Sequence, residues 1–460
     1  MVSRRRRIPY APVQTSVKTI RMIDLKDLRE NPDVYRRAAK LKRIDVDIDL
    51  LLEMDAKRRS LDNARQSLTA EKNSNGKQIA QLAGRLKSAS LDEQSALQEE
   101  MKQLRARPTE LKAQEQALDS QVAELEPRIL ELLLRCAQPA DDDVPVGKDD
   151  SENIEIKKWG TVRQFEFTPK DHMTLGSELN LIDVDRGVKL AGSRSYFLIG
   201  DGALLHQAVL RLAQDMMVEQ GFVPMTVPVM VREPAMVGTG YFPLGREQSY
   251  VLSNEEPAKY LVGTAEVSLT AYHMDETLEG KSLPRKYVGM SPCFRREAGT
   301  YGKDTAGLYR IHQFDKVEQV IICKNDIEES KRWHEAILQN AEAILQKLDL
   351  PYRVVKVCTG DLGQGQVAKY DIETWMPSRK SYGETHSASR FYDFQARRLN
   401  LRYRDEDGKV RICHTLNNTV IASPRVLIPI LELYQNADGT VTIPQALRPY
   451  MGGREIIGNR

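Results

Sequence analysis

The stretch Phe294-Arg295-Arg296-Glu297 places two guanidinium groups beside a carboxylate, directly after an apolar run that predicts a strand. Two arginines at a strand end can make charge-assisted, bidentate contacts to a phosphate. The small residues that follow, Ala298 to Gly302, predict a loop. A surface ion-pair cluster has the same composition, so these residues alone leave both a phosphate site and a surface cluster open.

A second polar stretch, Thr264-Ala265-Glu266, follows the apolar run Tyr260-Leu261-Val262. A hydroxyl and a carboxylate at a strand end could bind the ammonium group of a small polar ligand. The alternative is that the threonine and glutamate simply begin a helix as a partial cap.

Two single residues complete the set of candidates. Phe314 could stack on a nucleobase, and Arg425 precedes an apolar helix that continues through Ile428 and Leu431. The structural alternatives are a core phenylalanine and an ordinary surface arginine.

The usual nucleotide-binding signatures are absent from the sequence. Gly302-Lys303 is followed by Asp304, so it is not a P-loop, and no GxGxxG follows a predicted strand. The sequence contains no HExxH and no GxSxG either. If a nucleotide binds this chain, side chains must hold its phosphates.

The elements that would position these residues form a mixed α+β pattern. Residues 287–290, 317–322 and 352–357 predict strands, and 328–348 predicts an amphipathic helix. Because the strands do not alternate regularly with helices, we expect an antiparallel sheet with flanking helices rather than a parallel doubly wound sheet.

The segment from Asp49 to Arg135 is rich in strong helix formers. An a/d seam, typical of a coiled coil, runs along its second half through Leu97, Met101, Leu104, Leu111, Leu118, Val122, Leu125 and Leu132. A break at 83–90 predicts two long helices folded into an antiparallel hairpin. Pro108 should kink the second helix, and Asn75 and Gly76 should weaken the first.

The hairpin also carries basic residues that could grip an RNA backbone: Arg85, Lys87, Lys102, Arg105 and Arg107. Acidic residues interleave with them, so charge alone favours a solvated coiled-coil face or a dimerisation coil.

Composition sets broad limits on the class of protein. The 460 residues carry a formal net charge of only +2, so overall charge does not indicate a nucleic-acid partner. No run of about 18 apolar residues predicts a membrane span. The five cysteines are scattered with no CxxC pair, which favours a reducing compartment and predicts neither a disulfide framework nor a zinc site.

In combination, the polar stretches resemble the bacterial type of seryl-tRNA synthetase, a class II aminoacyl-tRNA synthetase. The resemblance runs from Met22 to about Gly453 and rests on ordered motifs: Thr-Ala-Glu, Phe-Arg-Arg-Glu-Ala-Gly, Arg-Ile-His-Gln-Phe-Asp-Lys-Val-Glu, Asp-Phe-Gln-Ala-Arg-Arg, His-Thr-Leu-Asn and Leu-Arg-Pro-Tyr-Met-Gly-Gly. It implies an antiparallel-sheet class II catalytic domain preceded by a coiled-coil hairpin that binds tRNA.

The implied domains are a basic, disordered extension at 1–21, a helical tRNA-binding arm at 22–137, a linker at 138–160 and a catalytic domain at 161–460. The extension could instead be a transit peptide or a nucleic-acid-binding tail, and Met22 is a candidate start.

The resemblance also implies the roles of individual residues. Arg295 and Arg425 would be the catalytic residues. Serine contacts carry over to Thr264, Ala265, Glu266, Glu318 and Thr419. Contacts to ATP carry over to Arg295, Arg296, Glu297, Phe314, Glu384, Thr385, His386, Ser387 and Arg425. Glu384 and Ser387 would hold Mg²⁺ with the ATP, and no zinc is expected.

The implied enzyme activates L-serine with ATP and transfers it to tRNA(Ser), with the selenocysteine tRNA as a second candidate substrate. It would be a homodimer in the cytoplasm without a membrane partner, and residues 221–228 resemble the motif that forms the dimer interface in the family.

The sequence departs from the family pattern at several positions. Ala306 stands where arginine is usual, Arg390 where asparagine is usual, and Thr419 where serine is usual. Asn418 and the run 421–424 also differ. We expect Thr419 to be harmless because it keeps a hydroxyl, and Ala306 and Arg390 to affect ATP handling or acceptor-end contact.

Two alternatives stay open at this stage. One is a catalytically weakened relative with a binding or regulatory role, and the other is a non-enzymatic coiled-coil scaffold. The intact charged set, which comprises Arg295, Glu297, Glu318, Glu384 and Arg425, favours an active enzyme.

Overall fold

The computed structural model describes residues 22–88, 90–299 and 307–458. The predicted extension at 1–21 and the departure at Ala306 lie outside these ranges. The described residues divide into two compact units: one lies within residues 46–134, and the other within residues 22–45 and 135–458. The structure thus groups the first part of the predicted 22–137 arm with the sheet-containing unit.

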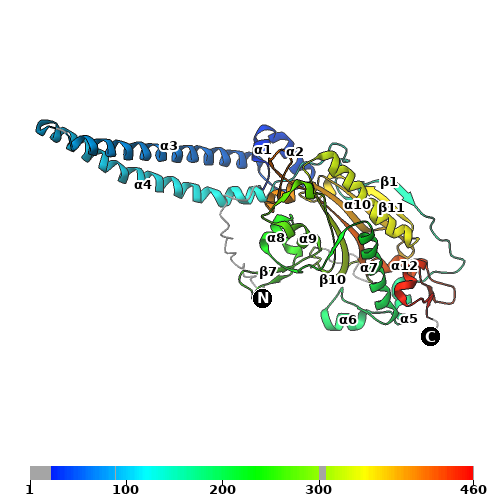
Figure 1. Cartoon of the computed structure of the whole chain (residues 1–460). Helices are drawn as coiled ribbons and strands as arrows, with labels where there is room; N and C mark the ends of the chain where they lie inside the picture. The colour runs from blue at the N-terminus through cyan, green and yellow to red at the C-terminus, as the bar shows by residue number, and fades with distance from the viewer. Residues whose placement is uncertain (1–21, 89, 300–306, 459–460) are drawn as a thin grey trace. The chain divides into compact units, whose positions relative to one another are not determined.

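The first unit is the predicted hairpin of two long helices. Helices α3 (Ile48–Leu86) and α4 (Leu91–Arg135) run side by side (Figure 1). Apolar residues of the seam are buried between them: Leu82, Leu97, Met101, Leu111, Val122 and Leu125. The antiparallel coiled-coil prediction is therefore confirmed.

Polar contacts also join the two helices. Arg65 pairs with Asp119 at 2.8 Å and Lys72 with Glu115 at 3.1 Å. Arg107 lies 2.7 Å from Glu71 and so is held by a carboxylate across the hairpin. These exposed pairs contribute little each, but they align the helices along their length.

Pro108 lies inside α4 without ending it. A proline has no N–H, so the carbonyl four residues earlier, that of Leu104, loses its helical donor. The Asn75 amide nitrogen on α3 donates a hydrogen bond to this carbonyl at 3.0 Å. Asn75 thus has a defined bonding role and does more than weaken its own helix.

The second unit is built on an eight-stranded sheet. The strand order is β1 (Ile154–Trp159), β11 (Tyr352–Lys356), β12 (Ala368–Met376), β13 (Ser381–Tyr392), β16 (His414–Ser423), β10 (Gln313–Cys323), β9 (Arg285–Phe294) and β4 (Val223–Met225). Neighbouring strands are antiparallel except β4 and β9, which are parallel. This confirms the predicted α+β class with an antiparallel sheet.

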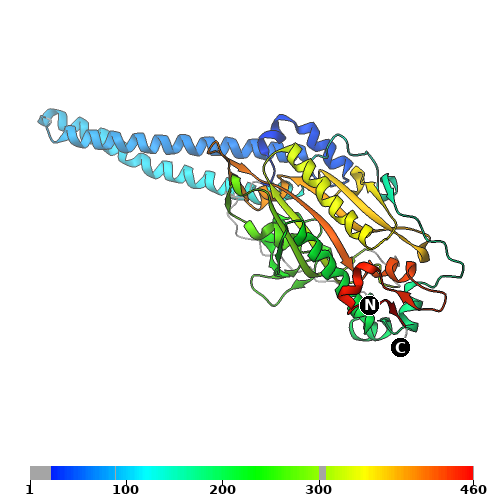
Figure 2. The ribbon, with the colours of Figure 1, turned by 45° about the vertical axis from the view of Figure 1, so that its right-hand side comes forward.

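Helices pack along one face of this sheet (Figure 2). Residues of α7 (Asp201–Glu219) and α10 (Ile327–Lys347) share one large apolar core with alternate residues of the strands. In β10, Val317 and Ile321 belong to this core, whereas Lys316 and Glu318 point to the opposite face because strand side chains alternate. The opposite face is therefore free to carry polar chemistry.

Helices α1 (Leu25–Glu30) and α2 (Pro32–Leu41) belong to the sheet-containing unit. Asp24, which caps α1, forms an ion pair with Arg397 at 2.9 Å. Lys42, which follows α2, is buried and donates hydrogen bonds to three carbonyls of the 363–366 segment at 2.5–3.2 Å.

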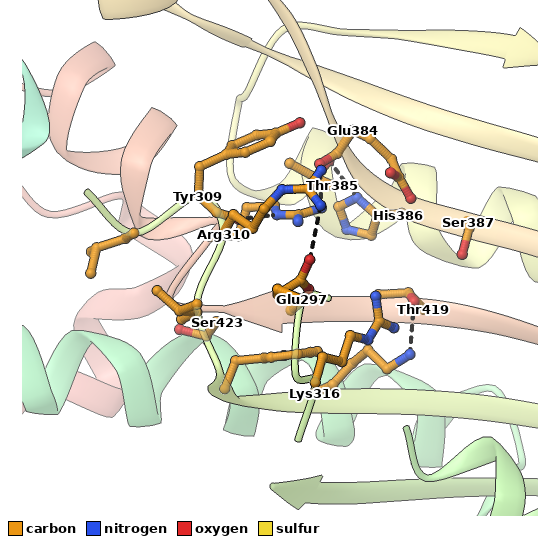
Figure 3. A pocket seen from close by; sticks show the side chains of 16 residues that line it. Glu297, Tyr309, Arg310, Lys316, Glu384, Thr385, His386, Ser387, Thr419 and Ser423 are labelled. Atoms are coloured by element: carbon orange, nitrogen blue, oxygen red, sulfur yellow. Dashed lines mark hydrogen bonds and ion pairs between the residues drawn. The ribbon is translucent and has the colours of Figure 1, made fainter. Parts of the chain in front are cut away.

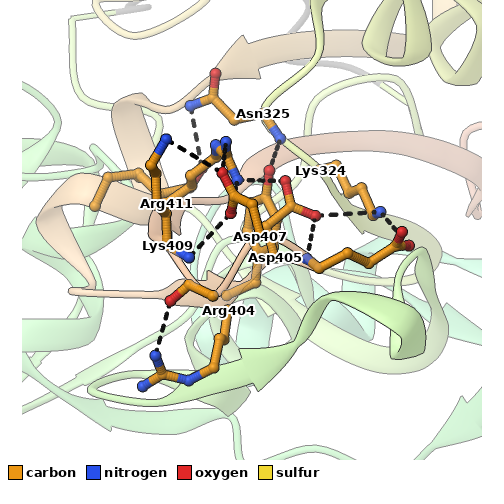
Figure 4. Close-up of polar contacts among 11 residues, drawn as sticks. Lys324, Asn325, Arg404, Asp405, Asp407, Lys409 and Arg411 are labelled. Atoms are coloured by element: carbon orange, nitrogen blue, oxygen red, sulfur yellow. Dashed lines mark hydrogen bonds and ion pairs between the residues drawn. The ribbon is translucent and has the colours of Figure 1, made fainter.

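A polar network holds the hairpin of β14 (Arg402–Arg404) and β15 (Val410–Ile412) against the end of β10 (Figure 4). Arg411 pairs with Asp405 and with Asp407, and Lys324 lies 3.5 Å from Asp405. The network thus lies at the Cys323 end of β10, whereas Phe314 lies near its other end.

The remaining helices are α5 (His172–Glu178), α6 (Val184–Ala191), α8 (Glu233–Gly238), α9 (Glu266–Thr270), α11 (Phe394–Arg398) and α12 (Leu427–Leu433). The remaining strands are β2 (Ile182–Asp183), β3 (Phe197–Leu198), β5 (Met230–Arg232), β6 (Val251–Leu252), β7 (Lys259–Leu261), β8 (Thr277–Glu279), β17 (Val441–Thr442) and β18 (Ile456–Ile457). Among the described residues, no helix combines the length and the apolar character that crossing a membrane requires.

Candidate active site

A cavity opens on the polar face of the sheet, over β10, β13 and β16 (Figure 3). Nine of the predicted site residues line it: Arg295, Glu297, Phe314, Glu384, Thr385, His386, Ser387, Thr419 and Arg425. These residues come from four separate stretches of sequence, and the antiparallel sheet brings the stretches together. The residues predicted to contact the phosphates, the base and the metal ion thus line the same cavity.

Two arginines frame the cavity, and each is held by its neighbours. The Arg295 guanidinium lies 5.3 Å from the centre of the Phe314 ring, and its Nε donates to the Gly263 carbonyl at 3.4 Å. Arg425 donates to the Tyr309 carbonyl at 3.0 Å and lies 4.4 Å from the centre of the Tyr309 ring. Both cations are therefore oriented before any ligand binds.

Glu384 stands between these cations. It has a backbone carbonyl that accepts from Arg425 Nη1 at 2.9 Å. The enclosing protein atoms alone would raise the pKa of its carboxyl, but Lys369, Arg425 and Arg295 nearby lower it. The side chain is therefore a carboxylate that can serve as a hard oxygen ligand.

A buried polar cluster adjoins the cavity on the same face. The Glu318 carboxylate lies 2.5 Å from Lys316 Nζ, and Thr264 Oγ1 donates to it at 3.3 Å. Thr419 Oγ1 lies 3.3 Å from Lys316 Nζ and 3.4 Å from Glu318. A small ligand with an ammonium and a hydroxyl group would find acceptors and donors for both here.

Glu266, the first residue of α9, lies beside this cluster. Tyr241 OH and Gln395 Nε2 each donate to its carboxylate at 2.8 Å, and its own N–H donates to Thr264 Oγ1 at 3.2 Å. Burial, reinforced by the nearby charge of Glu318, raises the pKa of Glu266 to about 7.

Some predicted residues do not offer a side chain to the cavity. Ala265 is fully buried in an apolar core. Arg296 does not line the cavity, and its backbone N–H donates to the Gln248 carbonyl at 2.9 Å. Thr385 and His386, by contrast, line the cavity. Thr385 Oγ1 lies 2.7 Å from His386 Nδ1, and burial lowers the pKa of His386 to about 3, so this imidazole is neutral.

Several residues in and beside the site were not predicted from the sequence. Lys316 could have been found, because it precedes Glu318 by two residues and a strand places both on one face. Tyr309 and Tyr241 come from loops with no local pattern. Arg310 and Gln395 stand in two of the family motifs, but the motifs do not indicate the contacts that these residues make. Arg310 pairs with Glu297 at 2.8 Å in the cavity wall.

The departure at Arg390 belongs to another part of the unit. Arg390 is buried and forms an ion pair with Asp141 of the linker, which also accepts from Tyr392 OH at 2.9 Å. Arg390 does not line the cavity. The expectation that this residue affects ATP handling therefore has no geometric support, and its contacts point to linker attachment.

Comparisons with known proteins agree with this geometry. Residues 22–131 match the model described as the seryl-tRNA synthetase N-terminal domain. Residues 250–434 match the tRNA synthetase class II core domain for G, H, P, S and T. The two matches cover the hairpin and the cavity respectively.

Relatives are similar over almost the whole chain. A serine–tRNA ligase of Deinococcus radiodurans is 44% identical, with 95% of this chain and 99% of that protein covered. The crystal structure of a Pyrococcus horikoshii seryl-tRNA synthetase complexed with ATP has a TM-score of 0.86 at 38% identity, covering 95% and 99% of the two chains. A cytoplasmic serine–tRNA ligase of Naegleria fowleri in complex with AMP has a TM-score of 0.83 at 28% identity, with the same coverage.

Proposed function

The chain belongs to the seryl-tRNA synthetase family and is an ATP-dependent serine–tRNA ligase, and we propose how its residues divide that reaction. The observation that carries the proposal is the joining of two subsites on β10. The cavity holds oriented arginines, and the adjoining buried cluster holds acidic and hydroxyl side chains. The comparisons give no support to a weakened relative with a regulatory role.

The buried cluster is proposed to bind L-serine. The carboxylates of Glu266 and Glu318 receive the ammonium group, and Thr264 orients both through its hydroxyl and the Glu266 N–H. Thr419 Oγ1 faces Glu318 and Lys316, so it can bond the serine hydroxyl. Alanine would leave these polar groups unpaired, which is the basis for rejecting it.

The cavity is proposed to bind ATP. Phe314 and Arg425 provide apolar and cationic surfaces for the adenine, and Arg295 and Glu297 lie at the phosphate side. A serine carboxylate oxygen attacks the α-phosphorus, and the bond to the pyrophosphate oxygen breaks in line. Arg295 stabilises the charge that builds up on the α-phosphate, and no side-chain nucleophile is needed.

The donor set around Glu384 fits a magnesium ion. Glu384 is ionised, and the Ser387 hydroxyl lies in the same cavity wall. Magnesium prefers one or two protein oxygens together with substrate phosphates and water. Bound there, the ion would supply charge neutralisation of the phosphates. Among the described residues, no three His, Cys, Asp or Glu side chains gather as a separate metal site.

The hairpin is proposed to bind the tRNA, because its sequence matches the family's N-terminal domain. Its basic residues Arg85, Lys87, Lys102 and Arg105 would contact the RNA backbone, while Arg107 is engaged with Glu71 and Glu110. Aminoacylation assays with tRNA(Ser) and the selenocysteine tRNA side by side test both proposed substrates.

We further propose a homodimer that works in the cytoplasm. Strand β4 is the edge of the sheet, and Val223 on it is about half exposed, as is Met290 on neighbouring β9. Apolar side chains at a sheet edge favour a protein partner. The described cysteines are all free and buried, which favours a reducing compartment.

The test is ATP–pyrophosphate exchange with serine, threonine and alanine compared side by side. Exchange should depend on serine and be lost in Arg295→Ala, whereas Arg296→Ala should retain most of it because Arg296 does not line the cavity. Deletion of residues 49–135 should spare exchange and abolish transfer to tRNA. Exchange by Arg295→Ala at the wild-type rate would refute the assigned role of this arginine.

A further inference from the structure

A buried histidine–glutamate pair lies next to the cavity and has no assigned role. His172, the first residue of α5, has its Nδ1 2.7 Å from Glu432 Oε1, and its backbone N–H donates to the same oxygen at 3.0 Å. Glu432, in α12, is fully buried. A carboxylate cannot donate, so Nδ1 carries the proton of this contact.

The imidazole also contacts the backbone of the cavity wall. The N–H of Leu308, which lines the cavity, donates to His172 Nε2 at 3.4 Å. At Gly307 a Cβ atom would lie 2.6 Å from the same nitrogen, and the residue has a φ of +81°. The chain at 307–308 therefore packs directly on the ring, and only glycine fits at the contact.

The second oxygen of Glu432 binds a segment behind Tyr309, a residue that lines the cavity. It accepts the N–H of Ser378 at 2.9 Å, while Oε1 accepts the Ser378 hydroxyl at 2.7 Å. Ser378 precedes Arg379, whose guanidinium lies 4.2 Å from the centre of the Tyr309 ring. The Glu432 carboxylate thus binds His172, which contacts Leu308, and also Ser378, which precedes Arg379.

These contacts meet at Tyr309 and Arg425. The Tyr309 ring has Arg379 at 4.2 Å and Arg425 at 4.4 Å from its centre, and its carbonyl accepts from Arg425 Nε at 3.0 Å. Arg425 is the residue assigned to the adenine above. A shift of the 307–309 backbone would therefore displace the guanidinium that contacts the nucleotide.

We propose that His172 and Glu432 are positioning residues for the nucleotide subsite. The imidazole, which faces Glu432 through Nδ1 and accepts from the Leu308 N–H through Nε2, holds the Leu308–Tyr309 backbone, and through it the orientation of Arg425. This inference rests on the assignment of the cavity to ATP. It predicts that ATP binding depends on the Nε2 acceptor of His172, although His172 itself does not touch the ligand.

Two substitutions separate positioning from simple stability. His172→Asn keeps a donor near the Nδ1 position and loses the Nε2 acceptor. His172→Gln places its carbonyl oxygen near the Nε2 position and loses the donor to Glu432. His273→Asn is the matched control, because His273 makes a similar 2.7 Å contact with Glu276 and does not line the cavity.

The readouts are the KM values for ATP and serine in pyrophosphate exchange, ATP affinity by calorimetry and Tm. We expect His172→Asn to raise the ATP KM and Kd about tenfold at nearly unchanged Tm and serine KM. His172→Gln should lower Tm while its ATP KM stays within about threefold of wild type. His273→Asn should leave the ATP KM unchanged.

Equal ATP affinity in wild type and His172→Asn would overturn the inference, as would parallel changes of Tm and ATP KM in both variants. A wild-type protein that binds no ATP would instead refute the proposed function. Should neither variant fold, Ser378→Ala, which removes one donor to Glu432, should raise the ATP KM about twofold, and no change there overturns the inference.

Discussion

Replacing Asn75 by alanine should loosen the hairpin only while Pro108 is present. Proline cannot donate to the carbonyl of Leu104, four residues earlier in α4. The Asn75 side chain makes that hydrogen bond from the opposite helix at 3.0 Å. In a Pro108→Ala protein the alanine N–H would bond Leu104, and the Asn75 contact would become redundant.

The magnitude follows from the hydrogen bond. A carbonyl that loses its partner inside the hairpin costs about 1–2 kcal/mol. Asn75 is itself buried, and its Oδ1 has no partner within the described residues, so its removal also relieves a small penalty. We therefore expect a net loss of about 1 kcal/mol with Pro108 and close to zero without it, a coupling of about 1 kcal/mol.

Amide hydrogen exchange in the full-length protein can measure this locally. Asn75→Ala should speed exchange of amides near 71–79 and 104–112 about fivefold, and Pro108→Ala should abolish the effect. Pro127→Ala is the control, because this proline lies in the same helix about 19 residues from Pro108 and should not couple to Asn75. Equal effects of Asn75→Ala in the wild-type and Pro108→Ala backgrounds would refute the reasoning.

Three further predictions concern the sheet-containing unit. Since burial raises the pKa of Glu266 from 4.5 to about 7, the native state holds a proton that the unfolded chain lacks between these values, so stability falls as pH rises from 4.5 to about 7 and levels off above. The advantage of Glu266→Gln over wild type in urea unfolding should thus grow by about 3 kcal/mol between pH 4 and pH 8; a constant difference contradicts this. Arg390→Asn should destabilise the fold by about 3 kcal/mol because it leaves Asp141 without its ion-pair partner, and the kinetics of ATP–pyrophosphate exchange should be unchanged. Adding Asp141→Asn should recover part of this loss, as measured by thermal unfolding. Thr264→Val should raise the serine KM about tenfold without changing the ATP KM, because it removes a hydrogen bond to the Glu318 carboxylate; equal changes in both KM values would argue against separate subsites.

Regular elements were predictable because their periodicity is local. The seam of the hairpin follows from a seven-residue spacing, and β10 follows from an apolar run bounded by polar residues. Alternation along β10 then decides which residues can face a ligand, and Lys316 with Glu318 obeys it. The clustering of Arg295, Glu384 and Arg425 was predictable only through the family resemblance, since the three residues are distant in sequence.

The residues that support the site were beyond sequence reasoning for a physical reason. His172 and Glu432 are 260 positions apart, and each has an ordinary local setting, at the start of a short helix and in an apolar one. The contact of Arg390 was beyond sequence reasoning in the same way, because its partner Asp141 lies 249 residues away in the linker. Such pairs depend on tertiary contact, which no local pattern encodes.

The charges that line the cavity bear on how the site holds its nucleotide. Arg295, Arg310, Lys316 and Arg425 carry four positive charges, and Glu297 and Glu384 carry two negative ones, while His386 is neutral because burial lowers its pKa to about 3. The lining therefore has a net charge of +2, against about four negative charges on ATP. A divalent cation at Glu384 would supply the difference, because the cations that keep this carboxylate ionised are too few to neutralise the phosphates themselves. Under the proposed assignment, the same carboxylate that reduces the positive charge of the cavity lining would serve as a ligand of a nucleotide-bound ion that restores the balance.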